Sequence, residues 1–283
     1  MSIITLTTDL GLKDHYVASL KGAIYTQSPN AVIVDISHEV RPFDINETAY
    51  YIRSVYKDFP EGTIHVIGVK TEPTVMHNGD VKDVPCVLKY DNHYFIAANN
   101  GIFGLLLKGV QPQGFWQIND FLAERFFMKD ITKFVFIPTA CKLLNNIPID
   151  EIATPTNRIV DAITPLAVLR EDMIVGKTIY IDNYGNVITN ITKEDFYSYQ
   201  NVSSFSIKFP SFEVDRISES YGDVPEGNPV AFFNLNGLLE MGINRGANGN
   251  GGGASRLLGI KENREVIVEF FFPGSKNTIS ETF

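Results

Sequence analysis

The fold of this chain is decided by the stretch Ile181-Asp182-Asn183-Tyr184-Gly185-Asn186-Val187-Ile188-Thr189-Asn190-Ile191. Apolar β-forming residues flank polar residues and a glycine, so the stretch predicts a strand, a tight turn and a second strand. Gly185 is expected to supply a backbone conformation that other residues adopt reluctantly. We expect the polar side chains of Asp182, Asn186 and Asn190 to gather at one end of a sheet, where they can hydrogen-bond a small polar ligand.

The start of the chain predicts a second polar group at the edge of a sheet. The short strand Ile3-Ile4-Thr5-Leu6-Thr7-Thr8 delivers Asp9 and Gly11 to the start of a helix near Asp14. In α/β proteins the carboxyl end of such a strand and the N-terminus of the helix face one crevice. Asp9 is therefore a ligand contact or a turn stabiliser, and Asp14 is a ligand contact or a helix cap.

Composition limits the classes of protein to which the chain can belong. A length of 283 residues suits one large domain or two ordinary ones. The net charge of -9 and the pI of about 5.1 argue against nucleic-acid binding, and no apolar run is long enough to span a membrane. Cys86 and Cys141 lie far apart, and the 5 histidines are scattered, so we expect a cytoplasmic protein without disulfides or a metal site.

The first half alternates strands with helices, which predicts an α/β domain, residues 1–165, with a layered, mainly parallel sheet. Asp44 and Glu47 have the spacing of a helix capping box, and Asp91-Asn92 predicts the turn of a hairpin. The expected elements are a buried parallel strand Val32 to Ile36, a helix from Pro42, a strand Ile64 to Val69, a polar loop Lys70 to Asp83, hairpin strands Val87 to Tyr90 and Tyr94 to Ala97, and a helix Pro138 to Asn145.

The second half consists of strands and turns, which predicts a C-terminal antiparallel β-barrel domain, residues 174–283. Besides the stretch that decides the fold, we expect strands at Phe205 to Phe209, Val230 to Asn244 and Val266 to Phe272. Asn236-Gly237 indicates a two-residue hairpin turn. Thr164-Pro165 is the expected linker, and Gly246 to Gly253 is a glycine-rich loop without the Walker phosphate-binding pattern.

The motifs, taken in order, resemble those of one family, the S-adenosylmethionine (SAM) hydroxide adenosyltransferases, which are related to fluorinating and chlorinating enzymes. Each motif is weak alone, but their order and spacing are specific over nearly the whole chain. The matching pieces are Thr8-Asp9-Leu10-Gly11 with Asp14 and Tyr16-Val17, Lys21-Gly22, Val34-Asp35-Ile36-Ser37-His38, Pro42-Phe43-Asp44-Ile45, Asp182 to Asn190, Tyr221-Gly222-Asp223-Val224-Pro225, and Asn234 through Asn244.

The resemblance implies a homotrimer that binds an adenosyl ligand between one subunit's first domain and its neighbour's second domain. SAM or adenosine would be the substrate or ligand, and no other cofactor is expected. The implied contacts are Asp9 to the ribose diol, Phe43 near the ligand, Asp182 to the amino-acid portion, Asn186 at the adenine, and Asn244 and Arg245 in the adenine pocket. As purely structural alternatives, Asn186 and Asn244 satisfy turns and Phe43 is a hydrophobic staple.

The chain departs from the family at the catalytic centre. Hydrolysing members carry a triad of Asp, Arg and His, and here Lys70 stands at the Asp position and His77 at the Arg position. The position of the His falls on Ile131 in an ungapped alignment and on Phe127 in a gapped one. No histidine follows His93 in the sequence, so this member of the triad is absent.

Three functions remain open. In the first, the chain still consumes SAM with a modified centre built from His77, Glu72 or Lys70, of which histidine is the natural base near neutral pH. In the second, it binds a different nucleoside, whose anionic group Lys70 neutralises. The third alternative is a nucleoside-binding protein that keeps the fold and has lost the reaction.

Overall fold

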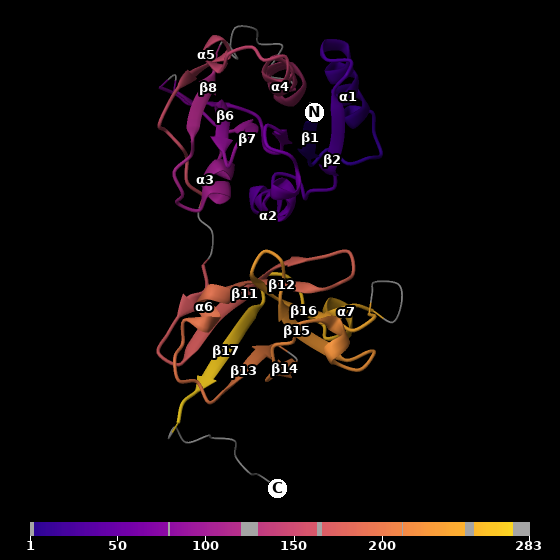
Figure 1. The fold of residues 1–283 in the computed structure, drawn as a ribbon, viewed down its shortest axis with the longest axis vertical. Helices are drawn as coiled ribbons and strands as arrows, with labels where there is room; N and C mark the ends of the chain where they lie inside the picture. Colours follow the sequence, from indigo (N-terminus) through magenta and orange to yellow (C-terminus); the bar gives the residue numbers. More distant parts are fainter. Residues whose placement is uncertain are drawn as a thin grey trace. The chain divides into compact units, whose positions relative to one another are not determined.

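The computed structural model describes residues 3–78, 80–119, 130–162, 166–210, 212–246 and 252–273. The chain divides into two compact units, Met1–Thr164 and Pro165–Phe283 (Figure 1). The expected linker Thr164-Pro165 and Phe127 lie outside the described residues. Within those residues, no helix has both the length and the apolar character needed to cross a membrane.

The first unit is built on a mixed sheet with helices, which confirms the predicted fold class. Its strand order is β2-β1-β3-β7-β6-β8-β9. The neighbours β2, β1, β3 and β7 run parallel, whereas β6, β8 and β9 pair in antiparallel fashion. The strands are β1 Ile3–Thr8, β2 Val32–Ser37, β3 Ile64–Gly68, β6 Pro85–Tyr90, β7 His93–Ala98, β8 Gly114–Ile118 and β9 Ala153–Pro155.

Helices cover both faces of this sheet because neighbouring residues on a strand point to opposite sides. Val66 on β3 packs in one apolar cluster with residues of α1 and α4, and Ile67 packs in another with residues of α2 and α3. The helices are α1 Tyr16–Gln27, α2 Ile45–Val55, α3 Ile102–Leu107, α4 Ile137–Leu144 and α5 Ile149–Ile152, with a 3-10 turn at Tyr56–Asp58 and a π-helical turn at Thr132–Phe136.

The two acidic residues proposed as helix caps have different outcomes. Oδ1 of Asp44 accepts hydrogen bonds of 3.0 Å from the backbone N–H groups of Asn46 and Glu47, so Asp44 is the N-cap of α2. Asp14 is not a cap: α1 begins at Tyr16 with His15 as its N-cap residue, and no side chain caps it. Asp14 lies one residue too early to reach the first helical N–H groups and is exposed.

Two further expectations for the first unit need correction, and one is confirmed. The apolar run of β2 is not fully buried, because β2 lies at the edge of the sheet. The expected loop from Lys70 to Asp83 contains a small hairpin, β4 Thr74–Val75 paired with β5 Val81–Lys82. Asp91 and Asn92 have φ angles of 50° and 60° between β6 and β7, which confirms the predicted hairpin turn.

The second unit is an antiparallel, barrel-like sheet, as predicted. Strand order is β14-β13-β17-β11-β12-β16-β15, and β10 pairs with β11. The stretch Ile181 to Ile191 forms the end of β11, the turn and β12, and Gly185 has a φ of 84°. The elements are β10 Val168–Leu169, β11 Met173–Ile181, β12 Val187–Thr192, α6 Lys193–Tyr197, β13 Ser204–Phe209, β14 Phe212–Val214, β15 Pro229–Phe233, β16 Leu238–Ile243, α7 Ala254–Leu257 and β17 Glu265–Phe271.

The hairpin signal Asn236-Gly237 identifies the correct hairpin but the wrong turn. Four residues, 234–237, connect β15 and β16, and the N–H of Gly237 donates to the carbonyl of Asn234 at 2.8 Å. Asn234 also accepts, through Oδ1, hydrogen bonds from the N–H groups of Asn236 and Leu238. This side chain replaces the strand pairing that a two-residue turn would require.

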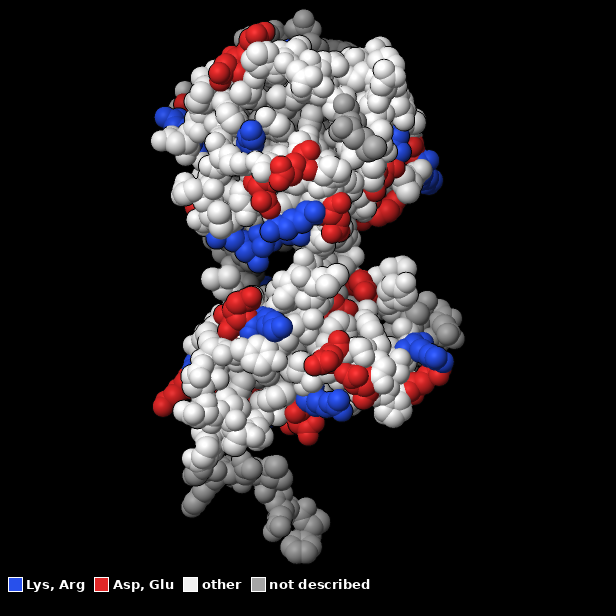
Figure 2. All heavy atoms as spheres, viewed as in Figure 1, with Lys and Arg blue, Asp and Glu red and all other residues white. Residues whose placement is uncertain are grey.

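Charged side chains of both signs are interspersed on the face of the molecule drawn in Figure 2. Lys and Arg number 24 and Asp and Glu number 33 in the sequence. Figure 2 shows these charges as small patches of each sign.

Candidate functional site

In the first unit, Asp9 lies where the chain leaves the carboxyl end of β1. Its Oδ2 accepts a hydrogen bond of 2.8 Å from the backbone N–H of Phe43. Burial raises the pKa of Asp9, the hydrogen bond from Phe43 opposes this rise, and the nearby charge of Glu72 adds to it. The structure thus brings Phe43 into contact with Asp9, and Glu72 is close enough for its charge to act on this carboxylate, although the three lie far apart in the sequence.

Phe43 does not act as a hydrophobic staple. Its side chain is 64% exposed, so it does not pack against the first turn of α2. Its φ of 66° lies in the left-handed region, which is uncommon for a bulky residue. Such a conformation indicates a local constraint, and here the constraint places the Phe43 N–H on Asp9 and leaves the ring exposed.

The three candidate catalytic residues occupy different parts of the segment that follows β3. Lys70 is exposed, with a φ of 50°, and Glu72 lies close enough to Asp9 to influence its pKa. His77 is exposed in the turn between β4 and β5. Of these three residues, Glu72 is the one whose charge acts on Asp9.

The sequence analysis missed Asn100, which follows β7 at the edge of the sheet where the parallel strands end. Its Nδ2 donates to the carbonyl oxygens of Lys70 at 2.7 Å and Val69 at 3.3 Å. Its Oδ1 accepts from the N–H of Ile102, at the start of α3. The signal in the sequence was Asn99-Asn100-Gly101 directly after an apolar strand, because polar residues gather where parallel strands end.

The segment in which the resemblance implies a histidine holds groups that cannot act as a base near neutral pH. Ile131 is 1% exposed and packs in the apolar core. Its neighbour Thr132 lies against the end of β3, since a Cβ added at Gly68 would stand 2.8 Å from Oγ1 of Thr132. A threonine hydroxyl offers hydrogen bonding but is not a base at this pH.

A chain of polar groups begins at Thr8, next to Asp9, and runs from the buried side chains of Thr8 and His38 to the exposed Asp35. Oγ1 of Thr8 is 2.7 Å from Nδ1 of His38, and Nε2 of His38 is 3.1 Å from Oδ1 of Asp35. Lys21 donates to Oδ2 of Asp35 at 2.5 Å. Burial of Asp35 acts to raise its pKa, but the hydrogen bonds from Lys21 and His38 outweigh it, so the pKa of Asp35 is lowered. This chain of contacts ties together β1, β2 and α1.

In the second unit, Asp182 and Asn186 are joined by two hydrogen bonds. Oδ1 of Asp182 accepts from the backbone N–H of Asn186 at 2.8 Å, and Oδ2 accepts from its Nδ2 at 2.9 Å. The same Nδ2 also lies 2.9 Å from the hydroxyl oxygen of Tyr221. Asn186 is 5% exposed, so its side chain fixes the orientation of the Asp182 carboxylate.

A second acid, Glu240, lies behind this pair and was also missed. The Tyr221 hydroxyl is 3.3 Å from Oε1 of Glu240, and Nδ2 of Asn234 donates to Oε2 at 3.0 Å. Burial and the charge of Asp182 raise the pKa of Glu240. Burial likewise raises the pKa of Tyr221, with the charge of Glu240 as the next cause. A lone acid in the apolar strand Leu238–Ile243 was the available signal.

The remaining predicted residues of this unit have other hydrogen-bond or ion-pair partners. Asn190 does not join Asp182: it lies along β12, and its Oδ1 accepts from the N–H of Lys177. Nδ2 of Asn244 donates to the carbonyl of Val224 at 2.7 Å, so this residue satisfies a loop. Arg245 is exposed and pairs with Glu226 at 3.0 Å.

The glycine-rich loop ends against the Asp182 turn. A Cβ added at Gly253 would lie 2.1 Å from the carbonyl oxygen of Tyr184 and 2.7 Å from Cα of Gly185. The N–H of Ser255 donates to the carbonyl of Gly185 at 2.8 Å. Residues 247–251 of the loop lie outside the described residues.

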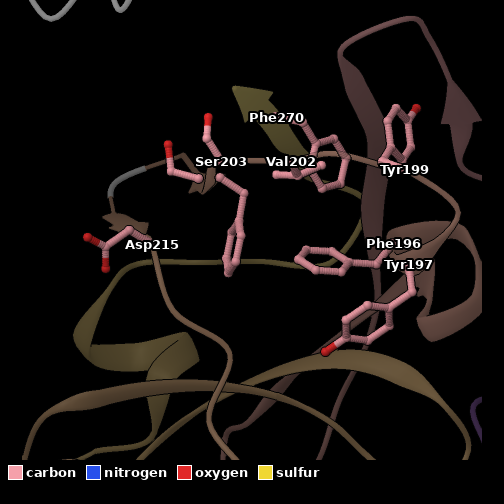
Figure 3. A pocket seen from close by; sticks show the side chains of 9 residues that line it. Phe196, Tyr197, Tyr199, Val202, Ser203, Asp215 and Phe270 are labelled. Carbon is pink, nitrogen blue, oxygen red and sulfur yellow. The ribbon is translucent and has the colours of Figure 1, made fainter. Parts of the chain in front are cut away.

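A separate pocket of about 400 Å³ opens beside α6, at the other end of β12 from the Asp182 turn. Figure 3 shows Phe196, Tyr197, Tyr199 and Phe270 on one side of it and Asp215 on the other. None of the predicted site residues lines it. The lining residues are Phe196, Tyr197, Tyr199, Val202, Ser203, Ser204, Phe205, Asp215 and Phe270.

Comparison with known proteins gives a consistent result. Residues 4–153 match the N-terminal domain of the SAM hydroxide adenosyltransferases, and residues 176–267 match their C-terminal domain. An (R)-S-adenosyl-L-methionine hydrolase of Thermus thermophilus is 26% identical over 94% of this chain and 99% of its own length. A fluorinase of Actinopolyspora mzabensis is 26% identical, covering 86% of this chain and 90% of the relative.

A solved structure of a conserved protein from Thermotoga maritima has the same fold. It superimposes with a TM-score of 0.74 at 25% identity, over 94% of this chain and 99% of that one. The two domain matches fall on the two units of the fold, one match on each unit. This chain belongs to the SAM hydroxide adenosyltransferase family.

Proposed function

We propose that this protein binds SAM and hydrolyses it to adenosine and methionine. The observation that carries this proposal is the Asp9 carboxylate, which Phe43 orients at the carboxyl end of β1. Two carboxylate oxygens facing a ribose diol can accept a hydrogen bond from each hydroxyl. The name of the Thermus thermophilus relative supports the choice of SAM as the substrate.

The reaction is a displacement at the ribose C5′. A water oxygen forms the bond to C5′ while the bond from C5′ to the sulfonium sulfur breaks, and its electron pair leaves with the sulfur of methionine. The attacking water gives up one proton, so the site needs an acceptor and an oriented water. Glu72 suits this role because it is an acid whose charge acts on Asp9, whereas the charge of Lys70 would repel the sulfonium.

A second candidate function is adenosyl binding without turnover. The sequence favours it at one point, since Lys70 replaces the family's acid and no histidine follows His93. Such a protein would keep Asp9 and Asp182 as ligand contacts and release no methionine. As in the family that the chain resembles, we propose a homotrimer with Asp9 of one subunit and Asp182 of its neighbour on the same ligand.

Incubation with SAM in ¹⁸O-labelled water separates these functions. Liquid chromatography with mass spectrometry should detect methionine and adenosine that carries ¹⁸O at its 5′ hydroxyl, above a control without protein. Unchanged SAM, together with measurable binding of adenosine in titration calorimetry, would establish the binding function instead. Sedimentation equilibrium, with and without adenosine, tests the trimer.

A further inference from the structure

The turn that follows β3 is held in a conformation that its own sequence disfavours. Lys70 has a φ of 50°, in the left-handed region, where an L residue with a side chain is disfavoured roughly 5- to 30-fold. Glycine adopts this region freely, and asparagine tolerates it through local hydrogen bonds, but lysine has neither advantage. Something outside the turn must therefore stabilise it.

The side chain of Asn100 supplies that stabilisation. It is 8% exposed, and its Nδ2 donates to the carbonyl oxygens of both residues at the bend, Lys70 at 2.7 Å and Val69 at 3.3 Å. Its Oδ1 is anchored at 3.2 Å by the N–H of Ile102. Asn100 therefore joins the turn after β3 to the rigid start of α3.

Only an amide satisfies this arrangement. The carbonyl oxygens of Val69 and Lys70 can only accept hydrogen bonds, and the N–H of Ile102 can only donate one. An aspartate would direct a charged acceptor at two carbonyl oxygens, and an alanine would leave buried groups without partners. The orientation of the Asn100 amide is fixed by these partners.

The residues that follow Lys70 in the turn link its backbone conformation to Asp9. Thr71 is 7% exposed and Pro73 is buried, so the turn is anchored in the unit on both sides of the exposed Glu72. The charge of Glu72 acts on Asp9. The backbone direction at Lys70 therefore decides where Glu72 stands.

We propose that Asn100 is a positioning residue: its amide holds Lys70 in the left-handed conformation and thereby fixes the turn that carries Glu72. This inference rests on the proposed function, because the edge that it orders is the one to which we assign the adenosyl ligand. It adds to that function the side chain that sets the backbone conformation of the turn after β3.

Three variants isolate the backbone effect: Asn100→Ala, Asn100→Ala with Lys70→Gly, and Asn100→Ala with Lys70→Ala. Without the clamp the ordered turn becomes the minor state, so Asn100→Ala should weaken adenosine binding roughly 5- to 30-fold in titration calorimetry. Lys70→Gly should restore most of the affinity, because glycine adopts the left-handed region freely. Lys70→Ala removes the same charge but keeps the backbone cost, and should restore little. Equal recovery with both would overturn the proposal.

Two measurements without ligand separate this proposal from the proposed function. In Asn100→Ala, the NMR backbone chemical shifts of Lys70 should move away from left-handed values, and the pKa of Asp9 should fall towards that of a Glu72→Gln variant. Asn99→Ala is the matched control: Asn99 is 5% exposed and bonds the carbonyl of Arg158 and the N–H of Val160, away from the turn. It should lower the melting temperature and leave both signals in place.

The outcomes are distinct. If the wild type binds neither adenosine nor SAM, the proposed function fails while the NMR signals still decide the role of Asn100. If Lys70 keeps its left-handed shifts in Asn100→Ala, the positioning role is wrong, whatever the affinity. Movement of the Lys70 shifts and of the Asp9 pKa in this variant alone supports it.

Discussion

The backbone N–H of Phe43 donates to Oδ2 of Asp9 at 2.8 Å from a left-handed conformation with a φ of 66°. The carboxylate is thus oriented by main chain and not by another side chain. Its direction should survive any substitution at position 43 that tolerates this backbone. The two residues can therefore be tested separately.

Asp9→Ala should weaken adenosine binding about 10- to 100-fold, because hydrogen bonds to a charged acceptor contribute about 1.5–3 kcal/mol. Titration calorimetry measures the change. The control ligand is 2′,3′-dideoxyadenosine, which lacks the diol and should bind wild type and variant alike. Equal losses for both ligands would remove Asp9 from the ribose.

Phe43→Gly should change the free energy of unfolding by less than about 1 kcal/mol, since relief of the left-handed strain offsets the flexibility of glycine. A buried phenylalanine would cost about 3–5 kcal/mol when truncated, but this side chain is 64% exposed. Urea denaturation measures stability, and calorimetry with adenosine shows whether the ring contacts the ligand. Unchanged affinity would mean that the ring does not touch it.

The double variant Lys70→Asp with His77→Arg should not gain SAM hydrolysis. It introduces the two residues that the resemblance implies at these positions, but Ile131, where the ungapped alignment places the third, is buried and cannot accept a proton. Chromatography of adenosine against the wild-type rate checks this. Faster release of adenosine would show that the third position is dispensable.

The stability of the first unit should fall in acid because of a buried histidine pair. Nε2 of His65 lies 3.3 Å from Nδ1 of His93, and Nδ1 of His65 lies 2.8 Å from Oγ1 of Thr5. Burial lowers the pKa of His65 to about 3, with the neighbouring His93 as the second cause. The unfolded chain, with an ordinary histidine pKa near 6.5, then binds more protons between these values. Stability is full above the unfolded pKa and is lost as the pH falls.

By linkage, His65 alone should lower the free energy of unfolding by about 2 kcal/mol between about pH 7 and pH 5. Burial also lowers the pKa of His93, although the charges of Asp91 and Glu61 oppose this, so the second histidine adds to the effect. Urea denaturation at both pH values measures the loss. His65→Gln should flatten the dependence, while His15→Gln, at an exposed site, should not. A slope that is equal in all three proteins would refute the assignment.

The two thiols should be inert in the folded protein. Burial raises the pKa of Cys86 to about 12, and burial also raises that of Cys141. Because the thiolate is the reactive form, Ellman's reagent at about pH 8 should label neither until guanidinium chloride unfolds the chain. Prompt labelling of the native protein would contradict this.

Local signals in the sequence identified much of the fold. The Asp44 cap, the Asp91-Asn92 turn and the Gly185 turn each depend on residues within a few positions of one another, so their patterns are visible in one dimension. The Asn236-Gly237 turn misled because the side chain of Asn234 captured the backbone of the connection. Asp14 misled because α1 starts later than its residues suggested.

The candidate site was harder to foresee because its order comes from distant partners. Asn100 and Lys70 stand 30 positions apart, and Tyr221 reaches Asn186 across 35. Such pairs have no periodic signature, so only the fold shows that they meet. The edge position of β2 likewise depends on strand order, which hydrophobicity alone does not fix.

The exposed edge of the first sheet has a consequence for handling the protein. An outer strand such as β2 offers backbone hydrogen bonds to other molecules, and charges on the strand discourage such pairing. On β2 this charge is Asp35, which holds Lys21 beside it. Asp35→Val would leave an apolar edge strand, so we expect this variant to precipitate at concentrations at which the wild type stays in solution.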